Sequence, residues 1–483
     1  MKQNFSIIIS FLFFVPTALQ AADTIKNESP NILFILSDDQ GWSQVSKPMH
    51  PEIPESHSKY LNTPNIDRLG DSGIRFTSGY APAPICTPTR RSILCGVSTA
   101  RGGTEFKSSF IPADHMTIPK AMIRANPAYM CAHFGKWGGT TMISSPEESG
   151  YIASDGITGN PTGGMPITFG YKNHREAPPF FIDNEDPKRT TSVTNSAVDF
   201  IRRAVEENRP FYVQVSYYAP HLSIVCGQET LNRYLGKGEP DRGYPPAWAA
   251  MLDEMDQGVG RLLDLLDDLN IDENTYVFFS SDNGGSEFVP GKNDEKKPLN
   301  HPLSGSKSTL MEGGIRVPFI VRGPGIKPGS HSNVPVVGYD LLPTFYDIAG
   351  GVQQLPDEID GGSIRHLFHD PFSGVVKRPL DAIVFHHPGK LSSAIRQGSY
   401  KLYVIWDQNG NIGSRYLFNL DSNVVENKNT DIADANIGIA DQMQNTLFDY
   451  LQSVDAKDPK TILDYLPRKK NKASSPPGFD ERR

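Results

Sequence analysis

Four oxygen-bearing side chains stand directly after two buried, strand-like runs of the sequence. Asp38 and Asp39 follow the first run, and Asp282 and Asn283 follow another. Ligand sites in open α/β sheets lie outside the carboxyl ends of strands, so we expect all four side chains at one edge. Three carboxylates brought together need a cation to offset their repulsion. Hard oxygen donors favour Ca²⁺, with Mg²⁺ as the alternative ion, although Asp and Asn are also common in ordinary turns.

A second candidate site lies in the segment 86–96, CTPTRRSILCG. Thr87 is a suitable N-cap and Pro88 a suitable first helical residue, so the sequence predicts a helix that has Cys86 at its N-terminus. Backbone N–H groups at that position favour an anion and would make a bare cysteine a reactive thiolate. Arg90, about one turn later, can face the same anion. The simpler alternative is a buried structural cysteine.

The elements that must position these residues are short apolar runs and one long amphipathic pattern. The apolar runs lie at residues 31–36, 211–215, 276–279, 317–321 and 382–385. Such runs are typical of strands covered on both faces, as in a parallel sheet. Apolar residues at three- and four-residue steps predict a long helix over residues 247–269. Strands that alternate with helices therefore predict a doubly wound α/β domain.

Near residue 380 the pattern changes to shorter pieces separated by Gly, Asn and Asp. Strand-like pieces are expected at residues 394–395, 400–404 and 416–419. A helix is predicted over residues 437–454. We therefore predict a catalytic domain at residues 23–378 and a smaller C-terminal subdomain of antiparallel sheet plus helix at residues 379–467. The charged, Pro- and Ser-rich tail 468–483 is expected to be disordered.

The N-terminus is typical of an export signal. Lys2 precedes an apolar run at residues 6–15, which is too short to span a bilayer, and Ala21 or Ala22 supplies a cleavage site. We predict a signal peptide at residues 1–22 and an exported protein, periplasmic or secreted, with a membrane anchor as the alternative. No later segment is long and apolar enough to span a membrane, so no stable membrane span is expected.

Composition excludes other classes. The 483 residues have a formal net charge of −8 and no long Lys/Arg run, which argues against nucleic acid as a partner. Hydrophobic residues make up 38% of the chain, so whole-chain disorder is excluded. Four cysteines are too few for a disulfide scaffold.

Taken together, the motifs resemble the formylglycine-dependent sulfatases, which are arylsulfatase-like enzymes of the alkaline phosphatase superfamily. The segment from Cys86 is similar to that family's signature, C-x-P-[ST]-R-x-x-x-L-x-G. Further segments match in the family's order: NILFILSDDQGW, TPNIDRLGDSGIRFT, HFGKW, APH, SSDNGGSE, LSGSKSTLMEGGIRVP and AIRQGSYKLY. The resemblance covers roughly residues 30–430. It implies a large mixed, mostly parallel central sheet flanked by helices, and a bacterial, exported carbohydrate sulfatase.

The resemblance also implies roles for individual residues. Cys86 is converted to Cα-formylglycine by a formylglycine-generating or sulfatase-maturating enzyme, and its hydrate is the nucleophile. The metal ligands are Asp38, Asp39, Cys86, Asp282 and Asn283. Arg90 holds the hydrate, Lys136 and Lys307 hold sulfate oxygens, and His221, or Lys307, protonates the leaving oxygen. The expected reaction is hydrolysis of a sulfate ester with release of inorganic sulfate.

Two positions depart from the family pattern. The family usually has G-K-W-H, but Lys136 and Trp137 are followed here by Gly138, so a histidine near the nucleophile is absent. The second half-reaction then needs another base, for which His115, His133 and His174 are candidates in space. Thr89 replaces the usual serine, which keeps the hydroxyl group.

The substrate class rests on the family and on export, and we expect a sulfated oligo- or polysaccharide. Candidate sugar contacts are loop residues near the expected strand ends: His174, Arg175, His301, His386 and His387. For each, an ordinary surface residue is the alternative. The competing functions are a phosphoester or phosphonate hydrolase of the same superfamily and a sulfated-glycan binding protein without turnover, the latter prompted by Gly138. A membrane phosphoethanolamine-type transferase is disfavoured because it needs several spanning helices.

Overall fold

The computed structural model describes residues 29–103, 114–139, 142, 144–293, 296–372, 374–407, 409–457 and 475–479. The predicted signal peptide at residues 1–22 lies outside them. None of the helices in these ranges combines the length and apolar character needed to cross a membrane.

Strand β1 (Asn31–Ser37) lies within the main sheet, and all seven of its residues are buried. It pairs in parallel with β7 (Phe211–Ser216) on one side and β9 (Thr275–Ser281) on the other. β4 (Met130–Gly135) and β5 (Ala153–Ser154) continue the parallel part beyond β7. These strands are almost continuously apolar because helices cover both faces of the sheet.

The other side of the sheet is mixed. β10 (Phe319–Arg322) runs antiparallel to β9 and to β2 (Ile74–Phe76), and β11 (Ser330–Ser332) pairs in parallel with β2. The strand order is β11-β2-β10-β9-β1-β7-β4-β5, which confirms the predicted mixed, mostly parallel sheet. The apolar run at 317–321 overlaps strand β10, which is antiparallel to both of its neighbours. Burial on both faces makes a strand apolar whatever its direction, so the run did not indicate the direction of the strand.

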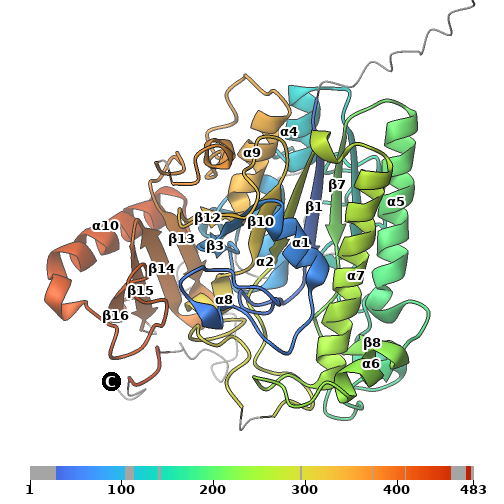
Figure 1. The fold of residues 1–483 in the computed structure, drawn as a ribbon. Coiled ribbons are helices and arrows are strands. Elements are labelled where there is room, and N and C mark those ends of the chain that lie inside the picture. The colour runs from blue at the N-terminus through green and yellow to red at the C-terminus, as the bar shows by residue number, and fades with distance from the viewer. Residues whose placement is uncertain are drawn as a thin grey trace, which may run out of the picture.

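Helices lie in a layer on each face of the sheet (Figure 1). Alternate residues of β1 face two separate apolar cores, one under each layer. Leu33 and Ile35 pack beneath the first layer, and Phe34 and Leu36 beneath the second. The first layer comprises α1 (Pro64–Asp71), α5 (Thr190–Glu206) and α7 (Pro246–Asp268). The second comprises α2 (Cys86–Cys95), α4 (Ile118–Ala125) and α9 (Leu341–Ile348). Helix α7 is the long helix predicted at 247–269, shifted by one residue.

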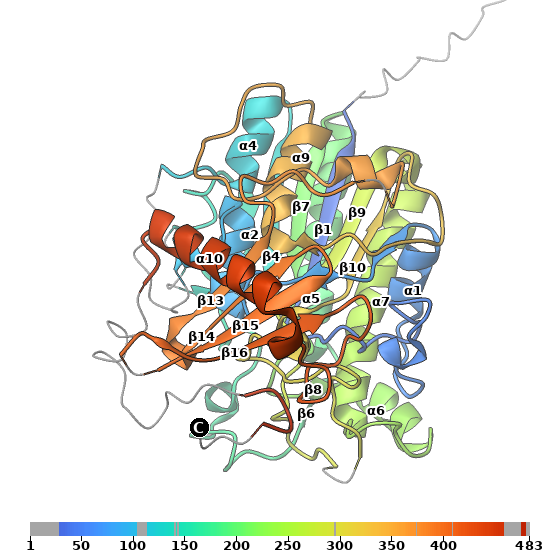
Figure 2. The same cartoon turned by 90° about the vertical axis from the view of Figure 1, so that its left-hand side faces the viewer.

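The C-terminal region forms the predicted antiparallel sheet plus helix (Figure 2). Its strands are β13 (Ile383–His387), β14 (Ser392–Gln397), β15 (Tyr400–Trp406) and β16 (Ile412–Asn419). Helix α10 (Ile437–Ser453) packs Met443 and Leu447 against this sheet. The apolar run at 382–385 therefore belongs to β13 of this sheet and not to the central one. Residues 475–479, within the tail predicted to be disordered, pack here, with the ring of Phe479 centred 4.4 Å from that of Tyr416.

The remaining elements are short and lie in the connections. The strands and helices are β3 (Gly79–Tyr80), β6 (Phe181–Ile182), β8 (Val225–Cys226), β12 (Val336–Val337), α3 (Thr99–Gly102), α6 (Gln228–Leu235) and α8 (Glu312–Ile315). Single 3₁₀ turns are η1 (Pro54–Ser56), η3 (Pro166–Phe169), η4 (Pro187–Arg189), η5 (Asp272–Asn274), η6 (Gly338–Asp340), η7 (Arg365–Phe368), η8 (Pro388–Lys390) and η9 (Asp434–Asn436).

A buried ionic cluster joins the two sheets. Lys401 of β15 donates to Glu312 of α8 at 2.9 Å and lies 2.7 Å from Glu426, and the side chains of all three are fully buried. Arg316 donates to the second oxygen of Glu312 at 2.5 Å. The backbone N–H of Glu312 donates to Glu426 at 2.5 Å, so the C-terminal subdomain is held directly to the start of α8.

Replacing Lys401 with Met is expected to lower the free energy of unfolding by about 3–5 kcal/mol, because two buried carboxylates lose their shared cation. Chemical denaturation at neutral pH measures the change. The matched control is Arg365→Met, which removes a half-exposed pair with Asp347 and is expected to cost at most about 1 kcal/mol. Equal losses in the two variants would contradict the importance of this cluster.

Candidate active site

Two neighbouring strands deliver the acidic residues to one edge of the central sheet. β1 and β9 run in parallel with Ser37 paired to Ser281, so the next residues along each strand, Asp38 and Asp282, leave the sheet side by side. The Asp38 and Asp282 side chains are at most 1% exposed. The structure therefore brings together the four side chains that were expected at one edge because they follow the ends of two strands.

The turn after β1 is shaped by hydrogen bonds to the turn after β9. Asp39 has a φ of 68°, a left-handed conformation that Asp tolerates better than most residues. In this conformation its backbone N–H donates to Asp282 Oδ1 at 3.1 Å. Asn283 Nδ2 donates to Asp39 Oδ1 at 2.8 Å. The two turns therefore hold each other in place.

Helix α2 brings Cys86 to the same point. Cys86 is the first residue of the helix and Ile85 is its N-cap, so the predicted cap at Thr87 is wrong by two positions. Thr89 explains the difference, because its hydroxyl donates to the carbonyl of Ala83 and so fixes the preceding turn. The Cys86 sulfur lies within 4.8 Å of carboxylate oxygens of Asp38 and Asp282.

Each of the three buried carboxylates pairs with one cation. Lys136 Nζ donates to Asp38 Oδ2 at 2.5 Å, and Lys307 Nζ donates to both oxygens of Asp39 at 2.5 and 2.7 Å. The third pair joins Arg90 to Asp282, with Nε and Nη2 at 2.9 and 2.7 Å from Oδ2.

These pairs set the protonation of the cluster. Burial alone would raise the pKa of Asp38, but the adjacent Lys136 ammonium holds it below its ordinary value. Burial likewise would lower the pKa of Lys307, and the carboxylate of Asp39 raises it. Burial, followed by repulsion from Asp38, raises the pKa of Asp282 to about 7. Of the three carboxylates, the two that pair with lysines, Asp38 and Asp39, therefore have the best-compensated negative charge.

His221 stands on the loop after β7. Its Nδ1 lies 2.5 Å from the carbonyl of Leu222, and because a carbonyl only accepts, Nδ1 must carry the proton. Its Nε2 then faces the acidic cluster, 3.8 Å from Asp39 Oδ2. Burial lowers the pKa of His221 to about 3. The ring is thus oriented by its own loop, with one nitrogen directed at the site.

The donor set fits a hard divalent cation. Within the described part of the chain, Asp38 Oδ1 and Asn283 Oδ1 are buried oxygens without a hydrogen-bond partner. Unpartnered buried oxygens are costly unless a ligand satisfies them. Two groups, Asp38–Asp39–His221 and Asp38–Cys86–Asp282, each place their donor atoms within 4.8 Å of one another. The carboxylates and the amide supply the oxygen ligands that Ca²⁺ and Mg²⁺ prefer.

The backbone conformation at position 138 explains why glycine stands there in place of the family's histidine. Its φ of 135° is one that L side chains rarely adopt, and a Cβ there would lie 2.7 Å from Met142 Cγ. The N–H groups of Gly138 and Gly139 donate to the carbonyl of Thr158 at 3.0 and 2.7 Å. The backbone after Lys136 therefore follows a path that excludes a side chain at this position.

Thr158 is the residue of this region that sequence reasoning missed. Its hydroxyl accepts from the Trp137 N–H at 2.9 Å and donates to the Gly135 carbonyl at 2.5 Å. It thereby fixes the loop that presents Lys136. A lone Thr in a loop some twenty residues downstream has no local sequence signal, so only the folded chain identifies it.

The other histidines proposed near the nucleophile are held elsewhere. His133 is 1% exposed, lies 3.1 Å from Ser216 Oγ, and has a pKa lowered by burial to about 3. His115 contacts the carbonyl of Cys95, at the opposite end of α2 from Cys86 and so about 13 Å along the helix. His174 packs edge-on against Phe288, with ring centres 6.3 Å apart. None of the three is in hydrogen-bond contact with residue 86.

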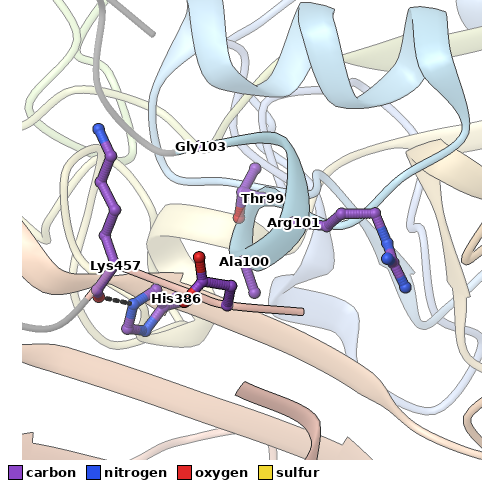
Figure 3. Close-up of a pocket in the computed structure, with 7 residues that line it drawn as sticks. Thr99, Ala100, Arg101, Gly103, His386 and Lys457 are labelled. Atoms are coloured by element: carbon purple, nitrogen blue, oxygen red, sulfur yellow. Dashed lines mark hydrogen bonds between the residues drawn. The ribbon is translucent and has the colours of Figure 1, made fainter. Parts of the chain in front are cut away.

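The predicted sugar contacts divide into two groups. His174 and His301 are partly exposed and Arg175 is exposed. The prediction that His386 and His387 are sugar-contacting loop residues is wrong. They are the last residues of β13 in the C-terminal sheet and are only 2% and 8% exposed. His386 is bonded to Ser393 Oγ and to the carbonyl of Lys457, both at 2.8 Å, beside a cavity of about 10 Å³ (Figure 3). A cavity of that size holds at most a water molecule.

The fold and the site together define a class of enzyme. Three carboxylates paired with three cations lie together at the carboxyl edge of a mixed α/β sheet, and the first residue of helix α2 lies among them. Such a site suits hydrolysis of an anionic ester, because it can hold both the ester's negative oxygens and a metal ion.

Comparisons with known proteins specify the class. The family model described as Sulfatase matches residues 30–352. The chain is 27% identical to a sulfatase of Formosa agariphila, over 80% of this chain and 81% of that one. It is 28% identical to N-acetylgalactosamine-6-sulfatase of Canis lupus familiaris, over 78% and 72% of the two chains. The fold matches the structure of Ps i-CgsB in complex with k-i-k-neocarrahexaose with a TM-score of 0.71, 26% identity, and coverage of 92% and 99%.

The chain belongs to the sulfatase family, as the motifs indicated, and is an enzyme that hydrolyses sulfate esters. A phosphonate monoester hydrolase from Silicibacter pomeroyi has the same fold, with a TM-score of 0.61 at 15% identity over 89% and 96% of the chains. That likeness concerns the fold alone.

Gly138→His is expected to reduce the free energy of unfolding by about 1–3 kcal/mol and not to raise turnover, because the backbone there is strained for any side chain. Chemical denaturation and initial rates measure the two effects. Gly139→His is the matched control: it shares a positive φ but has open space where its Cβ would lie. A stable, faster Gly138→His enzyme would contradict this account of the missing histidine.

Proposed function

We propose that this enzyme removes sulfate from a sulfated carbohydrate, with residue 86 acting as Cα-formylglycine beside a Ca²⁺ ion. The observation that supports this most strongly is the position of Cys86. Its sulfur lies among the carboxylates of Asp38 and Asp282 at the start of a buried helix, within the reach of three cations. A cysteine serving only as core packing would not need such surroundings.

The negative charge of a sulfate ester explains why the site contains three cationic side chains. A sulfate ester carries a negative charge that repels nucleophiles, so the site must hold that charge as it grows on the leaving oxygen. Lys136 and Lys307 present ammonium groups, which in this structure are paired with Asp38 and Asp39. Arg90 is fully buried between Asp282 and the Lys136 carbonyl, which it contacts at 2.7 Å, and so fixes the positive side of the site. We assign sulfate binding to the two lysines and orientation of residue 86 to Arg90.

The cation would be held by Asp38, Asp39, Asp282 and Asn283, together with residue 86. When bound, it supplies Lewis-acid polarisation and makes a hydroxyl in contact with it more acidic. Ca²⁺ is preferred over Mg²⁺ because the donors are mainly carboxylates, which Ca²⁺ binds in larger number, whereas Mg²⁺ usually keeps several waters. The unpartnered oxygens Asp38 Oδ1 and Asn283 Oδ1 are the supporting observation.

The modified side chain, made from Cys86 by a maturating enzyme, would supply two hydroxyls as its hydrate: one to displace the ester oxygen from sulfur, and one whose deprotonation would release sulfate. His221 Nε2 would take up the proton that the attacking hydroxyl loses and pass it to the departing sugar oxygen. With one water consumed in each turnover, the sum is ester plus water to alcohol, sulfate and a proton. The family's histidine cannot accept the second proton, since Gly138 occupies its position, and we assign that proton to solvent water.

A sulfated glycan is the substrate class that the relatives support. The structure of Ps i-CgsB, at 26% identity, holds a neocarrahexaose, and several curated relatives are named for a sulfated amino sugar. His174, Arg175 and His301 remain our candidates for sugar contacts, because all three have exposed atoms. Together with the predicted signal peptide, this supports a periplasmic or secreted enzyme of polysaccharide degradation.

The reaction is tested by incubating the enzyme, purified from a host with a maturating enzyme, with defined sulfated saccharides and measuring released sulfate. At least one saccharide is expected to be desulfated, and Cys86→Ala is expected to lose activity by about 10⁴-fold or more, because it removes the nucleophile. Cys95→Ala is the matched control at the other end of α2 and is expected to stay active.

The same panel contains a phosphate monoester and a phosphonate ester. Faster release of phosphate or of the phosphonate's alcohol would favour the alternative hydrolase. Saccharide binding without release of any product, from protein whose residue 86 is an aldehyde by mass spectrometry, would favour a binding protein. Full activity in Cys86→Ala would overturn the assignment of the nucleophile.

The cation site is tested by calorimetry on metal-free protein. Ca²⁺ is expected to bind at one site per chain and to raise the melting temperature, since binding only to the native state stabilises it. Asp282→Asn is expected to weaken binding at least tenfold, whereas Asp264→Asn, a control at an exposed ion pair, is expected to leave it unchanged. Unaltered affinity in Asp282→Asn would place the ion elsewhere.

A further inference from the structure

Lys188 is a buried lysine close to the site that the proposed chemistry does not use. It lies in η4, directly before α5, and is 3% exposed. Its ammonium donates to the carbonyl of Ser223 at 2.7 Å and makes a longer contact of 3.5 Å with the carbonyl of Gly164. Within the described chain it has no carboxylate in ion-pair contact.

One of the two carbonyls belongs to the segment that presents His221, and the other lies on a separate loop that is bonded to that segment. Ser223 is two residues after His221, and its N–H donates to the same Gly164 carbonyl at 3.0 Å. Leu222 lies between His221 and Ser223, and its carbonyl accepts a hydrogen bond from Nδ1 of His221. Lys188 therefore ties down the far side of the short segment that orients the histidine ring.

Keeping a charge at this position is costly. A buried ammonium that has only backbone partners loses most of its hydration free energy and gains no ion pair to compensate. Burial lowers the pKa of Lys188 to about 7, even though the carboxylates of Asp38 and Asp39 act in the opposite direction. An apolar side chain of similar length would fill the same space more cheaply, so packing alone does not account for a lysine here.

We propose that Lys188 is a positioning residue for His221: by holding the Ser223 and Gly164 carbonyls, it keeps the Leu222 carbonyl under Nδ1 and so directs Nε2 toward the leaving oxygen. This inference rests on the proposed role of His221 as the acid. It concerns Lys188 acting through its neighbours, since among the described residues its ammonium is bonded only to backbone. It adds a residue from the start of α5 to a site otherwise built from turns after β1, β4, β7 and β9 and from α2.

The test is a double-mutant cycle on a desulfated saccharide from the panel. Lys188→Met is expected to lower kcat by about 100-fold, the scale of a misplaced catalytic group, with little change in KM. In the His221→Ala background the same change is expected to cost almost nothing, because there is no ring left to position. On an aryl sulfate, whose leaving group departs without a proton, the loss in Lys188→Met is expected to be much smaller.

Controls separate positioning from folding. Lys120→Met removes another lysine that donates to a backbone carbonyl, that of His115 at 3.1 Å, and is expected to keep wild-type kcat. Lys188→Gln keeps one donor for the Ser223 carbonyl and is expected to recover part of the lost rate, and it serves as the test variant if the Met variant does not fold. Losses that multiply in the double mutant, or an unchanged kcat in Lys188→Met, would overturn the proposal.

A readout independent of turnover distinguishes this inference from the proposed function. In protein with ¹⁵N-labelled histidine, the Nδ1 proton of His221, assigned with His221→Ala, is expected to be protected from exchange in wild type and exposed in Lys188→Met. That result stands even if no saccharide is desulfated, in which case only the proposed reaction fails. Equal protection in both proteins would overturn the positioning role.

Discussion

Three carboxylates meeting in the interior, at the end of one sheet, are the constraint around which the rest of this molecule is arranged. Asp38, Asp39 and Asp282 are almost fully buried, and like charges at that spacing are tolerated only where cations compensate them. Each therefore has its own partner, and the partners come from three different segments of the chain. In the proposed reaction, the two lysines leave their carboxylates to hold the substrate's anionic oxygens, whereas the arginine pair is held by a second bond to backbone.

The surrounding architecture explains how the partners are held. The loop of Lys307 is bonded to the turn after β9, through Lys307 N to the Gly285 carbonyl, and to the segment before Cys86, through Ser308 N to the Pro84 carbonyl. A few residues later, Glu312 anchors α8 to the C-terminal subdomain. The small antiparallel sheet thus supports the segment that follows Lys307, although it supplies none of the acidic cluster.

Gly138 illustrates how function and backbone path are coupled. A histidine at this position would require a different conformation after Lys136, and that conformation is set by Thr158 and limited by Met142. The loss of one side chain is therefore a property of a whole loop. In the proposed reaction, the second proton therefore has to leave by a route that does not use a side chain at this position.

Several strands, the helices α7 and α10, the α/β class, the antiparallel C-terminal sheet and the acidic turns at Asp38 and Asp282 were predictable from the sequence, because apolar periodicity and strand-end polarity are local signals. The motif around Cys86 likewise identified the family before any contact was known. The direction of β10, the sheet to which β13 belongs, and the burial of His386 were not predictable, because a short apolar run has the same composition in either orientation or sheet. Only the tertiary structure decided the cation paired with each carboxylate, the conformation of Gly138, and the contacts of Lys188, because each depends on groups that are distant in sequence and meet only when the chain is folded.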